Sequence, residues 1–245
     1  MAVITIEGQV GAGANELGEA VASRLGYDYV ERLALQMVAK ELRTTTQAVW
    51  LKENHLCTWR ERLGETLTRA FENMGRYGTM DEPMGYGIMM DDPFYGSPLD
   101  KDVVRERPHE IPDDEYADAV QLVNAKLAET GALVLAKRAG CVTLRDHDNA
   151  LHVGLFAPKY YRVINLARQM TVGTLEASER LEAREGHRTK YFNRVAGTDP
   201  EDLSLYDIII RADRIDQQRA VTEVIEAIPI GDFRFQERPM PNWSL

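Results

Sequence analysis

The stretch "MAVITIEGQVGAGANELG", residues 1–18, decides the fold. Its apolar run predicts a buried strand over residues 2–7, followed by a glycine-rich turn over 8–13. A helix is expected next over 14–25, ending at Gly26. In a turn of this kind, successive backbone amides and the positive end of the following helix can surround an anion. The stretch therefore predicts a phosphate-binding loop.

The loop keeps the glycine frame of such sites but lacks their cation. The usual pattern G-x-x-x-x-G-K-[ST] reads here as Gly8, four residues and Gly13, followed by Ala14 and Asn15. The lysine that bridges two phosphates and the hydroxyl that holds magnesium are both missing, so a tight turn without any ligand is the alternative interpretation. The residues expected to contact a nucleotide are Gly8, Gly11, Ala12, Gly13, Ala14, Asn15 and Glu16.

Composition and charge narrow the class of protein. Apolar residues make up 44% and charged residues 28%, which is ordinary for a soluble globular chain. No apolar run approaches the roughly 20 residues that cross a bilayer, and no leader-like segment opens the chain, so we expect a cytoplasmic protein without a membrane partner. The net charge of −10 argues against nucleic acid as a partner. Residues 159–194 are nevertheless locally basic, which suits a small anionic ligand or an ordinary solvated face.

Short apolar strands alternate with amphipathic helices along the rest of the chain. This alternation predicts an α/β fold, a parallel sheet with helices on both faces. Further strands are expected over 132–140, 151–158 and 205–213. Helices are expected as two or three segments within 31–73, and over 113–131, about 159–170, 174–194 and 216–228.

Two segments lack this regular pattern. Residues 74–112 are rich in glycine, proline, methionine and aspartate, and predict an irregular insertion. Residues 231–245 predict an extended C-terminal tail that contains aromatic side chains. We expect one domain over 1–230 that carries this insertion. Both segments are candidates for contact with a protein partner or with a second copy in a homodimer.

Six short motifs occur along the chain in the same order as in the cytidylate kinase-like family and resemble the motifs of that family. It is a branch of the nucleoside monophosphate kinases with the P-loop fold. The motifs are "GAGANELG", "LGYDYVE", "LVLAKRAG", "LHVGLFAPKYYRV", "EGHRTKY" and "LYDIII". The resemblance covers about 1–73 and 112–228. It implies a three-layer P-loop kinase-like fold with a helical lid at about 174–194. It also implies transfer of the γ-phosphoryl group of ATP, with Mg²⁺, to CMP or a similar nucleotide.

The chain departs from the family pattern at several positions near the expected site. Ala14 stands in place of a glycine, and Asn15 stands where arginine is common. Lys137 replaces the glycine before the arginine of the third motif, and Glu31 replaces an aspartate. Because the loop lacks its lysine and Asn15 takes one more positive charge from the phosphate site, a second interpretation stays open. In it the chain is a degenerate kinase that acts by binding a nucleotide or a protein.

The resemblance and the expected strand ends together suggest roles for the basic residues. Arg138, at the carboxyl end of a strand, is the candidate cation for the acceptor phosphate, with a structural salt bridge as the alternative. In a regular strand Lys137 would point to the opposite face, so Lys137 and Arg138 are not expected to share one ligand.

Further arginines are expected on the lid. Arg180, Arg184 and Arg188 follow each other at intervals of four on one helix face, where an ordinary solvated face is the alternative. Arg162, in the helix after "AP", is a weaker candidate. The catalytic candidates are Arg138, Arg184 and Arg188, and the substrate-binding candidates are Glu31, Arg138, Arg162 and Arg180.

Overall fold

The computed structural model describes residues 2–54 and 111–228. Nearly all of the expected insertion at 74–112, the tail at 231–245 and the helical segments expected after residue 54 lie outside these residues. The strands are β1 (Val3–Gly8), β2 (Asp28–Tyr29), β3 (Leu133–Ala136), β4 (Ala150–Phe156) and β5 (Ile208–Arg211). The α-helices are α1 (Ala14–Leu25), α2 (Glu31–Glu41), α3 (Thr46–Asn54), α5 (Asp113–Thr130), α6 (Gly140–Thr143), α7 (Lys159–Met170), α8 (Thr174–Ala196) and α9 (Gln217–Glu226).

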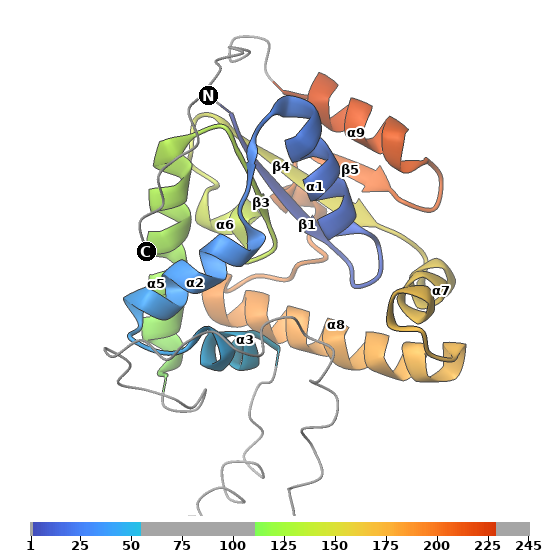
Figure 1. Ribbon diagram of the computed structural model, residues 1–245, viewed down its shortest axis with the longest axis horizontal. Coiled ribbons are helices and arrows are strands. Elements are labelled where there is room, and N and C mark those ends of the chain that lie inside the picture. Colours follow the sequence, from blue (N-terminus) through green and yellow to red (C-terminus); the bar gives the residue numbers. More distant parts are fainter. Residues whose placement is uncertain (1, 55–110, 229–245) are drawn as a thin grey trace, which may run out of the picture. The chain divides into compact units, whose positions relative to one another are not determined.

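The five strands form one parallel sheet in the order β2-β3-β1-β4-β5 (Figure 1). β1 lies in the middle of the sheet, with Ile6 opposite both Ala136 of β3 and Val153 of β4. Because all strands are parallel, their carboxyl ends meet at one edge, where β1 runs into the glycine-rich turn. The expected parallel sheet is confirmed, and it places the loop at the edge where ligands of such folds bind.

Helices cover both faces of this sheet. On one face, Ile4 and Ile6 of β1 pack in a buried cluster with Leu17 and Val21 of α1 and Val224 of α9. On the other face α6 approaches so closely that a Cβ added to Gly140 would lie 3.1 Å from the side chain of Thr5. Alternate residues of β1 thus face different layers, as expected for a strand covered on both sides. The result is the three-layer P-loop kinase-like arrangement.

The described residues divide into two compact units. The first comprises residues 1–31, 124–182 and 200–245, and therefore holds the sheet, the loop, α1, α7 and α9. The second comprises residues 32–123 and 183–199. Its described part is organised around Lys52, which is buried and donates to the carbonyl of Ile111 and to Asp113, each at 2.6 Å.

The expected strand over 132–140 is too long, because the strand ends at Ala136. Lys137, Arg138 and Ala139 all have positive φ, at 66°, 62° and 51°, so the chain turns away from the sheet there. The side chain of Asn124 donates to the carbonyl of Arg138 at 3.2 Å and holds this turn. Apolar residues on both sides of the turn gave it the appearance of a continuous strand in the sequence.

Two smaller differences concern the strands at the ends of the sheet. The two-residue strand β2 was not expected, and it is too short to show a period in the sequence. The strand expected over 205–213 is limited to β5, and Leu203–Leu205 form a 3₁₀ turn that the side chain of Asp202 caps. In the part of the chain that the structure describes, no helix combines the length and the apolar character that crossing a membrane would need.

Candidate functional site

The turn after β1 has the backbone geometry of an anion-binding loop. Gly11 and Gly13 have φ values of 79° and 97°, which residues with a Cβ rarely adopt. The amide of Ala12 donates to the carbonyl of Gln9 at 3.0 Å and closes the turn. Gly13 is the N-cap of α1, and no side chain caps the helix there. The first amides of α1 therefore remain directed toward the hollow of the loop, as at phosphate sites.

Helix α7 holds the loop in place from outside. A Cβ added to Gly11 would lie only 2.5 Å from the carbonyl oxygen of Arg162, so only glycine fits. The Asn165 side chain donates to the carbonyl of Gly11 at 3.2 Å. Arg162 donates from Nε to the carbonyl of Ala157 at 3.0 Å and from Nη1 to that of Val10 at 3.4 Å. Arg162 thus supports the loop, and its expected contact with substrate stays a prediction.

The position of the missing lysine is closed to a long side chain. Ala14 is 9% exposed and belongs to the core cluster under the sheet face. A Cβ added to Gly8 would lie 3.0 Å from the Cβ of Ala14, so the strand end and the helix start are in tight contact. A positive charge at the loop would therefore have to be supplied from another position than that of Ala14.

Glu31, the first residue of α2, collects hydrogen bonds from three directions. Asn15 Nδ2 lies 3.2 and 3.3 Å from its two carboxylate oxygens, and the Tyr29 hydroxyl donates to Oε2 at 3.3 Å. The ammonium group of Lys137 lies 2.8 Å from Oε1. Arg138 acts electrostatically on the same carboxylate. The regular strand that was expected here is replaced by a left-handed turn, so the two side chains do not alternate as they would in a strand. That Lys137 and Arg138 do not share one ligand stays a prediction.

The electrostatics of Glu31 and Tyr29 follow from this arrangement. Burial by itself raises the pKa of the Glu31 carboxyl, but the charge and hydrogen bond of Lys137, with Arg138 and the Tyr29 hydroxyl, hold that pKa below its usual value. Burial first, and then the negative charge of Glu31, raise the pKa of Tyr29 far above its usual value. Glu31 is thus ionised and Tyr29 is a neutral donor at neutral pH.

Arg138 lies at the edge of the sheet where the loop lies, directly after β3. It is 5% exposed and is among the most deeply buried charged residues of the described chain. Its backbone is held by Asn124, as described above. The buried guanidinium acts electrostatically on Glu31, while its contact with an acceptor phosphate stays a prediction.

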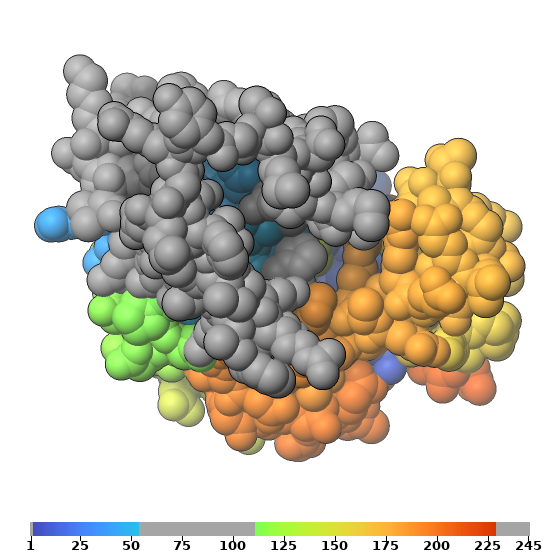
Figure 2. Space-filling view, turned by 90° about the horizontal axis from the view of Figure 1, so that it is seen from below, coloured from blue at the N-terminus to red at the C-terminus, as the bar shows by residue number. Residues whose placement is uncertain are grey.

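The three lid arginines lie on one continuous helix, α8, as expected. Arg180 belongs to the unit that holds the loop; it donates to Glu176 at 2.5 Å and approaches the sulfur of Met170 in α7 at 3.9 Å. The start of α8 packs on α7 through Leu166, Ala177 and Leu181, and the two helices lie side by side in Figure 2.

Arg184 and Arg188 belong to the other unit. The side chain of Arg184 is exposed. That of Arg188 is 11% exposed, lies 3.3 Å from Glu185, and stands over the ring of Phe192 at 5.6 Å from its centroid. The structure thus places the expected loop residues, Glu31, Arg138 and Arg162 in one unit. The catalytic roles of Arg184 and Arg188 stay predictions.

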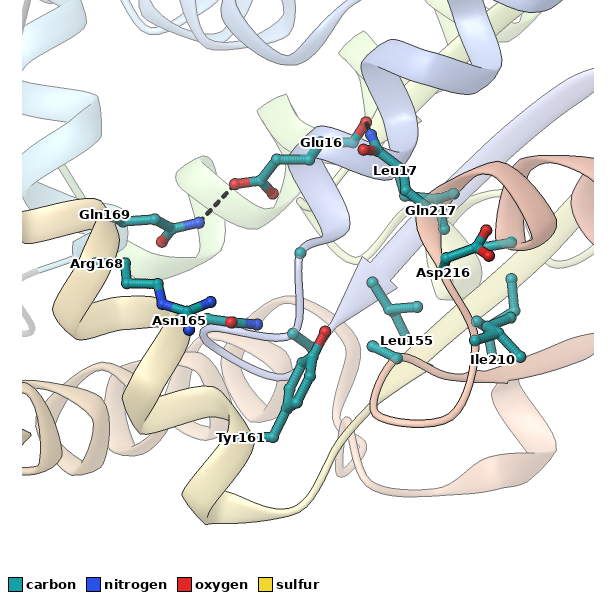
Figure 3. A pocket seen from close by; sticks show the side chains of 15 residues that line it. Glu16, Leu17, Leu155, Tyr161, Asn165, Arg168, Gln169, Ile210, Asp216 and Gln217 are labelled. Atoms are coloured by element: carbon teal, nitrogen blue, oxygen red, sulfur yellow. Dashed lines mark hydrogen bonds between the residues drawn. The ribbon is translucent and has the colours of Figure 1, made fainter.

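A cavity of about 290 Å³ opens beside the loop, and the sequence analysis did not identify it (Figure 3). Glu16 lies on its wall and accepts from Gln169 at 2.5 Å, while Gln217 donates to the Glu16 carbonyl at 3.0 Å. The lining residues come from the loop and α1, from α7, and from the end of β5 and the start of α9: Ala12, Gly13, Glu16, Leu17, Leu155, Tyr161, Asn165, Arg168, Gln169, Ile210, Ala212, Ile215, Asp216, Gln217 and Ala220.

The lining combines an apolar floor with a polar rim. Leu17, Leu155 and Ile210 provide the apolar part, and Asn165 and the exposed Arg168 lie at the side of α7. The volume is close to the lower end of the roughly 300–1,000 Å³ of small-molecule sites. An apolar slot that opens next to the amides at the start of α1 suits a heterocycle joined to phosphates. One sequence signal could have pointed to this wall, namely Arg168 within the basic region 159–194.

A metal site needs ligating side chains that lie close together. Among residues 2–54 and 111–228, no group of three or more His, Cys, Asp or Glu side chains is placed to hold a metal ion. Magnesium in nucleotide sites is commonly held by one or two carboxylates together with phosphates and waters, so the carboxylate of Glu16 on the cavity wall fits that ion as a single protein ligand.

Comparison with known proteins agrees with this geometry. Residues 3–214 match the sequence model of the cytidylate kinase-like family. The cytidylate kinase of Thermoplasma acidophilum is 27% identical over 100 residues, which are 41% of this chain and 53% of that protein. The cytidylate kinase of Methanopyrus kandleri is 32% identical over 95 residues, 36% of this chain and 49% of that protein. The chain thus spans about half the length of these relatives.

The fold has a counterpart among solved structures. An uncharacterized protein from Eubacterium ventriosum superposes with a TM-score of 0.59 at 15% sequence identity, over 93% of this chain and 98% of that one. At this identity the likeness concerns the fold alone. The family match, in contrast, extends over more than four fifths of the chain, from the start of β1 to the segment between β5 and α9. This chain belongs to the cytidylate kinase-like family.

Proposed function

We propose that this chain is a nucleotide kinase, which transfers the γ-phosphoryl group of ATP to CMP or a similar nucleoside monophosphate. One observation carries the proposal: in a single compact unit, a glycine loop with an uncapped helix start adjoins a cavity of about 290 Å³. Membership of the cytidylate kinase-like family supports a nucleotide as the ligand.

The donor nucleotide would occupy the loop and the cavity together. The amides from Gly11 to Asn15 would hold its phosphates, and the apolar floor at Leu17 and Ile210 would take up the base. The amides at the start of α1 and the positive φ of Gly13 support this placement of the phosphates. Glu16 would hold Mg²⁺, which would supply positive charge for the transfer.

The acceptor would bind at the neighbouring strand end, where Arg138 and Glu31 lie. An oxygen of the acceptor phosphate would attack the γ-phosphorus of ATP, the bond from that phosphorus to the bridging oxygen would break, and ADP would leave. Because the protein contributes mainly position and charge to this reaction, the fixed guanidinium of Arg138 would orient the acceptor. Arg180, Arg184 and Arg188 of α8 would add positive charge around the transferred group.

The proposal is tested with purified protein, ATP, Mg²⁺ and each of the four common nucleoside monophosphates, with ADP formation as the readout. Arg138→Ala and Arg188→Ala should each abolish turnover. Arg219→Ala is the matched control, because that arginine is 71% exposed and pairs with Glu223 of its own helix. Turnover that survives in both site variants would contradict the roles of these arginines.

A second candidate function follows from the closed position of Ala14. In this alternative the chain is a degenerate kinase that binds a nucleotide without turnover, or binds a protein through the 74–112 insertion and the 231–245 tail. Calorimetric binding of ATP without ADP formation would support it. Absence of any nucleotide binding would remove the enzymatic proposal and the role of the loop together.

A further inference from the structure

We propose that Lys137 supplies, from the turn after β3, the positive charge that the phosphate loop lacks at Ala14, and that it binds the terminal phosphate of a nucleoside triphosphate. The inference rests on the proposed function, since it needs a triphosphate on the loop. It assigns the work of a missing lysine to a residue more than 120 positions later in the chain.

The first step is geometric. Lys137 Nζ and Asn15 Nδ2 both lie within 3.2 Å of the same oxygen atom, Oε1 of Glu31. Asn15 is in the first turn of α1, directly after the loop. The ammonium group of Lys137 and the side chain of Asn15 therefore contact the same carboxylate, beside the start of α1 where the loop presents its amides. A phosphate bound there would lie within reach of a flexible lysine side chain.

The second step concerns the backbone of Lys137. Its φ of 66° lies in the left-handed region, where glycine is unstrained and lysine is not. Lys137 forms an ion pair with Glu31, but the lysine side chain is 54% exposed and that of Glu31 is 27% exposed, so solvent weakens the attraction in this pair. Folding stability alone would thus favour glycine at this position. The lysine contributes a charge that glycine cannot, and this points to a ligand.

The third step separates Lys137 from its neighbour. Arg138 is 5% exposed and held among buried groups, whereas more than half of the Lys137 side chain is open to solvent. Lys137 can therefore leave Glu31 for a phosphate at small cost. Glu31 would keep its bonds from Asn15 and Tyr29 when this happens. Arg138 and Lys137 thus provide one buried cation and one exposed cation that can follow the transferred phosphate.

Calorimetric titration of the full chain with ATP and with ADP, both with Mg²⁺, tests the inference. Lys137→Met should weaken ATP binding by about tenfold or more, the usual weight of a charge-assisted hydrogen bond, and ADP binding by less. Lys137→Arg should restore most of the ATP affinity. Lys137→Gly should bind ATP as weakly as Lys137→Met, although its melting temperature is equal to or above that of the wild type.

Lys159→Met is the matched control, because Lys159 is also about half exposed, at 53%, and also pairs with a glutamate, Glu182. It should bind ATP as the wild type does. ATP binding that is unchanged in Lys137→Met, or equal losses of ATP and ADP affinity, would overturn the inference while the proposed function stands. A wild-type chain that binds neither nucleotide would overturn both.

Discussion

Glu31 shows how a single carboxylate can link three segments around a site. Its partners come from the start of α1, from β2 and from the turn after β3. Because its folded-state pKa lies below the usual glutamate value of 4.5, the ionised form is favoured by folding. The contribution of the Glu31 charge to the free energy of unfolding is therefore complete above pH 4.5 and is lost as the pH falls through the folded-state pKa.

We expect Glu31→Gln to reveal this contribution through its pH dependence. The difference in unfolding free energy between wild type and variant should be measurable at about pH 7 and should shrink at an acidic pH below the folded-state pKa of Glu31, where the carboxyl, like the amide, is uncharged. Urea unfolding at the two pH values measures it. Glu182→Gln is the control, since the exposed pair of Glu182 with Lys159 should give a smaller change. A difference independent of pH would contradict the argument.

Gly11 carries a second prediction at this scale. Gly11→Ala combines a positive φ with a Cβ 2.5 Å from the Arg162 carbonyl, so it should destabilise the fold by about 3 kcal/mol and weaken nucleotide binding. Gly26→Ala is the matched control. Gly26 also has positive φ, at 68°, but no atom lies within 4 Å of its added Cβ, so a loss of about 1 kcal/mol is expected. Equal losses in thermal unfolding would contradict the close approach of loop and α7.

At the scale of elements, α8 contains a glycine at a position that does not require one. Gly186 lies inside the helix, and nothing lies within 4 Å of an added Cβ. Gly186→Ala should therefore raise the unfolding free energy by about 1 kcal/mol. If α8 bends during catalysis, the same variant should lower kcat while leaving the affinity for ATP unchanged. Thermal unfolding and steady-state kinetics measure the two effects, and a loss of stability would contradict the first.

Elements with a strong local signal were predicted well from the sequence. The helix over 14–25 and its end at Gly26 agree with α1 and its left-handed C-cap. The strand at 151–158 and the helix at 159–170 agree with β4 and α7 within a residue or two. In these elements the apolar period, the caps and the tertiary structure all favour the same conformation.

Elements whose conformation is set by distant contacts were predicted less well. The turn over 137–139 is held by Asn124 and by the packing of Gly140 on Thr5, neither of which is visible in a local pattern. The cavity was missed for the same reason. Its walls come from three regions of the chain, so no local stretch of sequence contains it. The glycines of the loop could be identified, whereas the shared bonding of Glu31 could not.

On the scale of the whole molecule, nucleotide binding is expected to stabilise the fold and to protect the segments around the cavity. Nucleotide that binds only the folded state should raise the unfolding free energy by about 2.7 kcal/mol at a concentration 100 times its dissociation constant. Hydrogen exchange with and without ADP should show added protection at the loop, at α7 and at the start of α9, because these segments line the cavity. Protection absent from all three segments would contradict the cavity as the nucleotide site.

The central place of β1 has a consequence for biosynthesis. Its neighbours in the sheet, β3 and β4, begin at residues 133 and 150, whereas β1 ends at residue 8. At a translation speed of about 5–20 residues per second, this apolar strand leaves the ribosome roughly 10 s before either neighbour exists. During that interval both of its edges are open to wrong partners. A nascent chain of this protein should therefore depend on early shielding by chaperones, long before any nucleotide could stabilise it.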